Sequence, residues 1–288
     1  TNGDTANIGV TMTEDTALKD ENTHTNNAGG IYTWTGNVSG IEGLENNYII
    51  TVNNGKSTVD KANLTIDLND VKHTYGSPNL NDYGVSSVTG LTNGDTANIG
   101  VTMTEDTALK DENTHTNNAG GSYTWTGNIS GLEGIENNYN ITVNNGKSTV
   151  DKANLTIDLN ENVHHEYGKP NLDDYVITGT DGLTNGDEAF EDKLDVTMTH
   201  DDALTDNNTH TKPAGGDYTW TGSVDGIEGL EDNYNITINP GKSTVDKGHL
   251  TITVDDSNTT VGDNPNYGGT VDGWQMEIIQ MISIINFG

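Results

Sequence analysis

The sequence contains no cysteine, no arginine and no long uninterrupted apolar run. Without cysteine, no disulfide bond can stabilise the fold. The apolar stretch from Ile278 to Phe287 is broken by Gln280 and Ser283 and is too short to cross a bilayer. We therefore expect no membrane insertion.

Basic residues are scarce, because 12 lysines stand against 44 acidic residues and give a formal charge of −32. Such a surface repels phosphate, so nucleic acid and anionic membranes are disfavoured as partners. Only 31% of residues are hydrophobic, a value that would indicate disorder if these residues were scattered. They instead form short alternating runs between Gly, Asn and Asp, which predicts a thin core of two β-layers.

The chain is organised around a repeated block that begins at Ala28, Ala119 and Ala214. Residues 1–69 and 92–160 differ at only five positions, which implies recent tandem duplication within a longer array. The block has strand alternation and glycine punctuation and no concentration of reactive side chains. This combination predicts a repeated β-module rather than an enzyme.

The repeat, of about 91 residues, predicts the domain boundaries. We expect the later part of one repeat at 1–61, complete repeats at 62–152 and 153–247, and the start of a further repeat at 248–274. The chain would thus start inside a module, as expected of an internal fragment. We expect an all-β fold of tandem small modules, β-sandwich or β-grasp-like, in an elongated array.

No flexible linker fits between the predicted modules. The segment Val59 to Ala62 joins the last strand of one repeat directly to the first strand of the next, which predicts a semi-rigid array. The neighbouring repeats of the same chain are therefore the expected partners of each module.

A comparison of the copies tests the strand assignments, because outward positions should drift toward polar residues. In one predicted strand, Tyr32 and Trp34 face the core, while outward Ile31 becomes Ser122 in the next copy. In a second strand, the face of Tyr139, Ile141 and Val143 is predicted to point inward. The Asn-Gly pairs, as in Asn93-Gly94, predict tight reversals with positive φ.

Residues 275–288 do not continue the repeat. In a reading frame shifted by two bases, codons for Gln275-Met-Glu-Ile278 can encode Asn-Gly-Asp, the turn that the repeat requires here. We therefore expect a frameshifted tail without an evolved role, and the nucleotide sequence tests this hypothesis.

Histidines beside carboxylates are the first candidates for metal binding or proton transfer. His24, His115 and His210 each stand alone in a Thr/Asn-rich segment without a partner at ligand spacing, so they are predicted to be polar loop residues. The adjacent pair His164-His165 has no double counterpart in the other copies and is a weaker candidate.

Acidic residues are the second candidates for metal binding, because carboxylate oxygens bind Ca²⁺. The candidates are the Asn-Gly-Asp turns and the runs Asp173-Asp174, Asp201-Asp202 and Asp255-Asp256. None spells an EF-hand loop or a Gly-Gly-x-Gly-x-Asp nonapeptide. Turn chemistry and solubility explain them, and Ca²⁺ at module junctions is the alternative.

Serines and aromatic residues are the remaining candidates, for nucleophilic catalysis and for sugar binding respectively. Ser57, Ser148 and Ser243 have no paired histidine and no Gly-x-Ser-x-Gly setting. Tyr32 and Trp34 would form a sugar-stacking platform if exposed, but their alternation with threonine favours the core. We predict no catalytic, cofactor-binding or metal-binding residues and no enzyme activity.

In its repeated motifs the chain resembles the MBG and YDG repeats of large bacterial surface adhesins of the filamentous-haemagglutinin type. The matching motifs are Lys-Ala-x-Leu-Thr-Ile, a Tyr-Gly turn, Gly-Leu-x-Asn-Gly-Asp and Asn-Tyr-x-Ile-Thr, and they cover nearly all of residues 1–274. The Thr/Asn-rich insertion around His24 and the tail after Trp274 depart from the family pattern. The resemblance implies an extracellular stalk that presents a distal binding domain and carries no catalytic residues.

We therefore expect structural spacer repeats of an adhesin on the bacterial cell surface, with host or bacterial glycan or protein bound by a region outside this sequence. A chain that is acidic, free of cysteine and rich in Thr, Asn and Gly is typical of bacterial export. The alternative is that the repeats themselves bind glycan or Ca²⁺.

Overall fold

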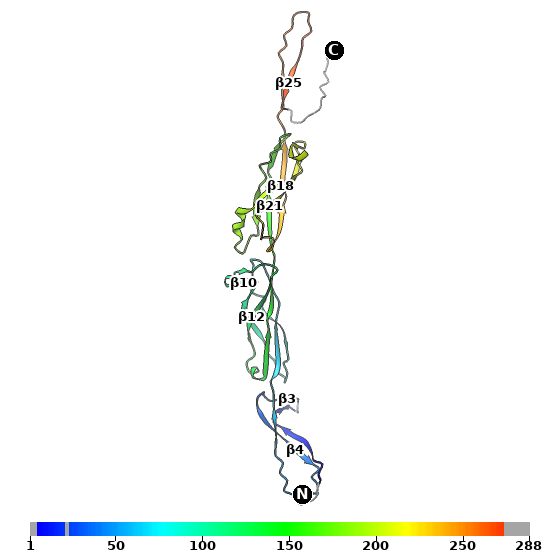
Figure 1. Cartoon of the computed structure of the whole chain (residues 1–288), viewed down its shortest axis with the longest axis vertical. Coiled ribbons are helices and arrows are strands. Elements are labelled where there is room, and N and C mark those ends of the chain that lie inside the picture. Colours follow the sequence, from blue (N-terminus) through cyan, green and yellow to red (C-terminus); the bar gives the residue numbers. More distant parts are fainter. Residues whose placement is uncertain (1–4, 21–22, 274–288) are drawn as a thin grey trace. The chain divides into compact units, whose positions relative to one another are not determined.

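The computed structural model describes residues 5–20 and 23–273. The fold is mostly β-strand, which confirms the predicted all-β class. The chain divides into two compact units, Thr1–Val150 and Asp151–Gly288, and each is described by itself (Figure 1). The predicted frameshifted tail, residues 275–288, lies outside the described residues.

The first unit holds a complete module of two sheets. One sheet has the strand order β13-β6-β8 and the other has the order β7-β14-β12-β9. The strands and 3₁₀ helices are β6 Ala62–Leu68, β7 Val71–Thr74, β8 Val85–Thr89, β9 Gly100–Asp106, β10 Leu109–Lys110, η2 Asp111–Asn113, β11 His115–Thr116, β12 Ser122–Ser130, η3 Glu136–Asn138, β13 Tyr139–Asn144 and β14 Gly146–Asp151.

The core of this module lies between the two sheets. Leu64 and Ile66 of β6 are fully buried, and Ile129 of the opposite sheet packs against their cluster. Trp125 of β12, also fully buried, anchors a second cluster with Leu68 and Val71. Burying a side chain of this size stabilises the fold by about 1.5–3 kcal/mol. The module is thus a small β-sandwich, one of the two architectures that the sequence predicts.

The second unit repeats this sandwich, with the sheet orders β17-β15-β22 and β16-β23-β21-β18. Its elements are β15 Ala153–Leu159, β16 Val163–Glu166, β17 Ile177–Asp181, η4 Glu188–Lys193, β18 Asp195–Asp201, β19 Leu204–Thr205, η5 Asp206–Asn208, β20 His210–Thr211, β21 Asp217–Asp225, β22 Tyr234–Asn239 and β23 Gly241–Asp246. A β-hairpin follows, formed by β24 Thr251–Val254 and β25 Gly269–Asp272.

Residues 5–61 of the first unit form only part of a sandwich. Their strands are β1 Gly9–Asp15, β2 Leu18–Lys19, β3 His24–Thr25, β4 Ile31–Ser39 and β5 Gly55–Thr58, with the sheet order β1-β4-β5. We call these residues the N-terminal half-module, and residues 248–273, which carry β24 and β25, the C-terminal half-module.

The predicted Asn-Gly turns hold, and the predicted inward faces hold within the complete modules except near strand ends. Asn93 and Gly94 have φ values of 62° and 75°, and Asn185 and Gly186 repeat the reversal, which confirms the Asn-Gly turns. Trp125 is buried as predicted, but Val143 is 37% exposed because it lies near the end of β13. The inward prediction for Val143 is therefore wrong. In residues 5–61 the equivalent inward positions Tyr48, Ile50 and Val52 are 44%, 40% and 54% exposed, so the prediction is wrong there.

Candidate functional site

In each complete module the first strand runs parallel to a strand from the end of the module. In the second unit β15 pairs with β22 from Ala153↔Tyr234 to Asp158↔Asn239, and β16 pairs with β23 in the same direction. Only Pro240 separates β22 from β23, and one residue cannot reverse a chain, so β23 continues the course of β22. We call this pairing of first and last strands the terminal-strand clamp.

The clamp passes from one sheet to the other at Asn160, whose backbone and side-chain polar groups are all bonded. Its N–H donates to Val176 O at 3.0 Å, and its carbonyl accepts from the indole of Trp220 at 2.9 Å and from Lys242 N at 3.1 Å. The Asn160 amide donates to Asp174 O at 2.9 Å and accepts from Val176 N at 3.3 Å. Asn69 and Trp125 repeat the indole bond at 2.8 Å in the first unit. Asn160 therefore fixes the point at which the clamp changes sheet.

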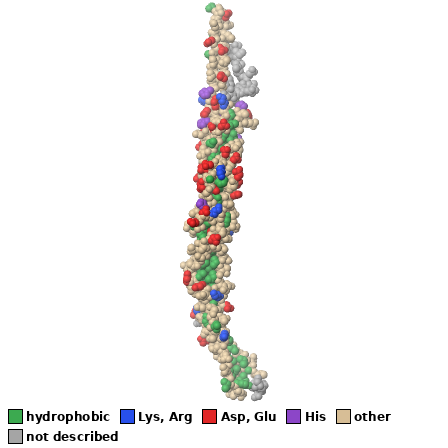
Figure 2. Space-filling model, turned by 60° about the vertical axis from the view of Figure 1, so that its left-hand side comes forward, with side chains coloured by type: hydrophobic (Ala, Val, Ile, Leu, Met, Phe, Trp, Pro, Cys, Tyr) green, Lys and Arg blue, Asp and Glu red, His purple; other side chains and the backbone are tan. Residues whose placement is uncertain are grey.

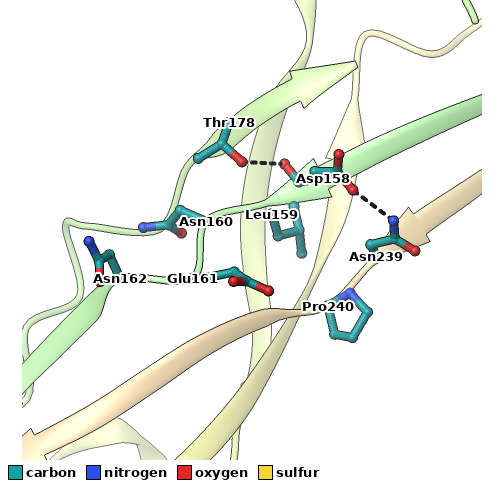
Figure 3. Close-up of a pocket in the computed structure, with 8 residues that line it drawn as sticks. All are labelled: Asp158, Leu159, Asn160, Glu161, Asn162, Thr178, Asn239 and Pro240. Atoms are coloured by element: carbon teal, nitrogen blue, oxygen red, sulfur yellow. Dashed lines mark hydrogen bonds between the residues drawn. The ribbon is translucent and has the colours of Figure 1, made fainter. Parts of the chain in front are cut away.

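A polar cavity of about 850 Å³ opens beside this corner (Figure 3). Figure 3 shows Asn239 donating to Asp158, and the Nδ2–Oδ1 distance is 2.7 Å. Glu161, also in the lining, pairs with Lys242 at 2.8 Å. Both carboxylates are thus engaged by side chains from the last strands. None of the eight labelled lining residues is aromatic, so the cavity has no platform for sugar stacking.

The same cross-strand contact occurs in the first unit. Asp67 of β6 accepts hydrogen bonds from Ser87 Oγ at 2.6 Å and from Asn144 Nδ2 at 2.7 Å. These bonds lower the pKa of Asp67. The recurrence shows that carboxylate–asparagine contacts of this kind belong to the clamp.

A histidine–aspartate pair is buried in each complete module. In the second unit His165 Nε2 lies 3.0 Å from Asp201 Oδ2, and neither side chain is exposed to solvent. Tyr175 donates to Asp201 Oδ2 at 2.7 Å and Ser243 donates to Asp201 Oδ1 at 2.6 Å. The ring of Tyr175 meets Trp220 edge-on, with the ring centroids 4.7 Å apart. The cluster joins β16, β18 and β23, which all belong to one sheet, to the core.

The cluster sets the protonation of Asp201. Burial raises the pKa of this carboxyl, but hydrogen bonds from His165, Ser243, Ala203 and Tyr175 more than offset burial and hold the pKa at about 2, below the ordinary value of 3.8. Burial and the Asp201 carboxylate raise the pKa of Tyr175, which keeps its hydroxyl protonated as a donor.

Acid is expected to weaken the second module through this carboxyl. In the unfolded chain Asp201 takes up a proton near its ordinary pKa of 3.8, whereas in the folded chain it takes up the proton only near its lowered pKa of about 2. Stability from this group is therefore complete above about pH 4 and is lost as the pH falls toward 2, by on the order of 2 kcal/mol. Melting temperatures between these values for the wild type and Asp201→Asn measure the effect, and parallel curves would contradict it.

The serines do not lie where a nucleophile would. Ser243 Oγ donates to the Asp201 carboxylate, whereas in a nucleophilic triad the serine bonds to the histidine. Ser148, its equivalent in the first unit, is buried, and its hydroxyl has no hydrogen-bond partner within the described part of the chain. Ser57 in the N-terminal half-module lies on β5.

The buried pair was missed by the sequence predictions, although two signals indicate it. Val71 and His73 alternate on one strand in the first unit, as Val163 and His165 do in the second, which places both histidines on the inward face. Asp106 and Asp201 are also kept between the copies while their neighbours change. His73 Nε2 lies 3.0 Å from Asp106 Oδ2, so the pair recurs.

The predicted loop histidines lie on short surface strands. His24, His115 and His210 each contact the hydroxyl of the preceding threonine through Nδ1, at 2.9–3.0 Å. His164 is exposed beside Asp246 at 3.1 Å. No group of three or more His, Asp or Glu side chains converges as metal ligands within residues 5–20 and 23–273.

The acidic runs also separate in the structure. Asp201 is buried, whereas its neighbour Asp202 is partly exposed and bonds to Thr219 Oγ1 at 2.8 Å. Asp255 and Asp256 are exposed in the C-terminal half-module. Acidic side chains are spread over the face shown in Figure 2, among scattered lysines.

A repeat junction is present inside the first unit. The Asn93 side-chain amide bonds to both backbone polar groups of Thr25. Thr25 N donates to Asn93 Oδ1 at 2.6 Å, and Asn93 Nδ2 donates to Thr25 O at 2.9 Å. Ala28 N donates to Asn138 Oδ1 at 2.9 Å. Only residues 59–61 separate β5 from β6. The N-terminal half-module and the complete module are thus joined without a flexible linker.

Comparisons with known proteins identify no family for this chain. No protein-family model and no curated protein matches the chain. Similar solved structures are Drosophila N-cadherin EC1-4, at a TM-score of 0.22 and 9% identity over 85% of this chain and 67% of that chain, and the I9-I11 tandem of titin, at 0.22 and 10% over 84% and 89%. TM-scores this low support no conclusion about this chain. No helix within the described residues is long and apolar enough to span a membrane.

Proposed function

We propose that this chain is a structural stalk or spacer of a bacterial cell-surface adhesin, exported from the cell, whose repeats carry load and present a distal binding region. The observation that carries the proposal is the terminal-strand clamp. In each complete module the chain begins at one end of a parallel strand pair and ends at the other, as with Ala153 and Asp246.

This geometry suits a module that is under tension applied at its N-terminal and C-terminal ends. Tension on the first and last strands acts along the strands, so the hydrogen bonds between β15 and β22 are loaded together. Hydrogen bonds loaded together resist more than bonds that break one after another. The repeat junction supports the proposal because it passes tension directly from β5 to β6 through residues 59–61.

The second candidate function is binding of glycan or Ca²⁺ by the repeats themselves. The cavity of Figure 3, with Asp158 and Glu161 in its lining, is the observation that favours it. Both carboxylates already have partners in Asn239 and Lys242, which favours a structural role.

Binding measurements on the whole 288-residue chain separate the two candidates. For a spacer we expect no glycan-array signal and no change in melting temperature with millimolar Ca²⁺, because a ligand that binds only the folded state must raise stability. A Ca²⁺-dependent rise that is lost in Glu161→Gln would instead establish the cavity as a binding site. Glycan binding by the chain would contradict the spacer proposal.

A further inference from the structure

A turn of the complete module in the first unit lies at the repeat junction. Asp95 N donates to Thr92 O at 2.9 Å and closes the turn. Its two central residues, Asn93 and Gly94, both have positive φ, which is the signature of a type I′ reversal. The hydroxyl of buried Tyr139 bonds to Thr92 N at 3.0 Å and to Asp95 Oδ2 at 2.8 Å. The turn is therefore fixed to the core of its own module.

The side chain of this turn holds the preceding repeat. Both polar atoms of the Asn93 amide are bonded to the backbone of Thr25, a residue 68 positions earlier in the chain. The ring of His24 lies beside the next residue, since a Cβ at Gly94 would be 3.4 Å from His24 Nε2. While these contacts are formed, the Asn93 amide is not free to turn.

A second asparagine holds the same segment of the preceding repeat. Asn138 Oδ1 accepts from Ala28 N at 2.9 Å. Asn138 is followed by a tyrosine, whereas Asn93 is followed by a glycine. A side chain on the following residue hinders attack of its backbone nitrogen on the asparagine amide, and glycine has no side chain. Of the two asparagines at the junction, Asn93 therefore has the unhindered nucleophile beside it.

We propose that Asn93 is a covalent modification site that is protected while the junction is closed and that reacts when the junction opens. In the reaction the backbone nitrogen of Gly94 attacks Cγ of Asn93 and forms a C–N bond. The bond from Cγ to Nδ2 breaks, and Nδ2 takes the proton of the attacking nitrogen and leaves as ammonia. Water then hydrolyses the cyclic imide to aspartate or isoaspartate. The reaction needs water and no oxidant or reductant.

The closed junction suppresses the first step. Cγ must turn toward the nitrogen of Gly94, and Nδ2 must leave, so both bonds between Asn93 and Thr25 have to break. Two hydrogen bonds of ordinary strength should slow the reaction at least about tenfold. Proteins open locally without unfolding as a whole, and such an opening at the junction would release the amide.

The product prevents the junction from closing again. Aspartate at position 93 has no Nδ2 donor, so a carboxylate oxygen would face the carbonyl oxygen of Thr25, and two acceptors repel. Isoaspartate also adds a methylene group to the backbone of a turn that Tyr139 holds in place. A temporary opening would thus become a permanent loosening between neighbouring repeats.

Peptide mapping by mass spectrometry of the 288-residue chain, incubated in mildly alkaline buffer, tests the protection. We expect Asn93 to lose its amide at least about tenfold more slowly in the folded chain than in guanidinium chloride. Asn138→Ala removes the bond to Ala28 without changing the reacting residues, so it should speed the reaction at Asn93 in the folded chain. Asn137→Ala, at the exposed neighbouring position, should not.

Variants of Thr25 test the contact itself. Thr25→Pro removes the N–H that Asn93 accepts and should speed the reaction, whereas Thr25→Ala keeps both backbone groups and should leave the rate unchanged. Unchanged melting temperatures show that both variants fold. Equal rates at Asn93 in the folded and denatured chain, or in Thr25→Pro and Thr25→Ala, would overturn the proposal.

Hydrogen exchange tests the effect of the product. In Asn93→Asp the amides of residues 24–29 should exchange faster than in the wild type, because the bonds to Thr25 are weakened. Asn145→Asp makes the same change at an exposed asparagine that also precedes a glycine, and it should leave exchange at residues 24–29 unchanged. Equal exchange in the two variants would contradict the loosening of the junction.

Discussion

Replacing Asp201 by asparagine is expected to destabilise the second module by about 3 kcal/mol at neutral pH, because it removes a buried carboxylate that is hydrogen-bonded to His165, Tyr175 and Ser243. The new amide nitrogen would take the place of the oxygen that accepts from Tyr175 and faces His165. Two donors would then face each other between side chains that are closed to solvent. Urea unfolding of the whole chain measures the loss, and hydrogen exchange by mass spectrometry assigns it to residues 153–246.

The chain supplies its own controls for this prediction. Asp202→Asn changes the neighbouring residue, whose bonds to Thr219 and His200 lie at the surface and are screened by water, so little stability should be lost. Asp106→Asn should instead destabilise the complete module of the first unit, where His73 and Tyr83 bond to the same carboxylate. Equal losses in Asp201→Asn and Asp202→Asn would show that the buried cluster has no special role.

Resistance to force is expected to depend on the direction of pulling. Tension applied at the ends of the second module loads the clamp along its strands. Tension applied through Asp192→Cys and Glu228→Cys acts at one end of the antiparallel pair β18–β21, where Asp195 lies opposite Asp225, and opens the bonds one at a time. We expect a clearly lower unfolding force in the second direction, measured with optical tweezers.

The two attachment sites allow the unfolding forces in the two directions to be compared without a change in the fold or in the labelling. Both positions are exposed, and the chain has no cysteine that would compete for the handles. Melting temperatures of the double variant should match the wild type, so that a lower force reflects geometry rather than lost stability. Equal forces in the two directions would contradict the role of the clamp.

Much of the fold follows from the sequence because the repeat provides internal comparisons. Outward positions such as Ile31 drift to polar residues between copies, which reveals the strand faces. The Asn-Gly turns follow from local chemistry, because these residues adopt positive φ at little cost. Both signals depend on residues close together in sequence.

The parallel clamp could not be predicted in the same way, and the partners of the buried histidines could not be identified from alternation alone. Pairing of Ala153 with Tyr234 joins residues far apart in the chain, and alternation alone does not specify which strands become neighbours. His165 was given little weight because it is adjacent to His164 and the pair has no double counterpart, yet Asp201, Tyr175 and Ser243 come together around it in the folded module.

Pulling the wild-type chain from its two ends tests whether these modules resist tension along the chain. We expect two high-force unfolding events, one for each complete module of about 90 residues, and each should lengthen the chain by about 30 nm. Gradual extension at low force, without two discrete events of that length, would contradict it.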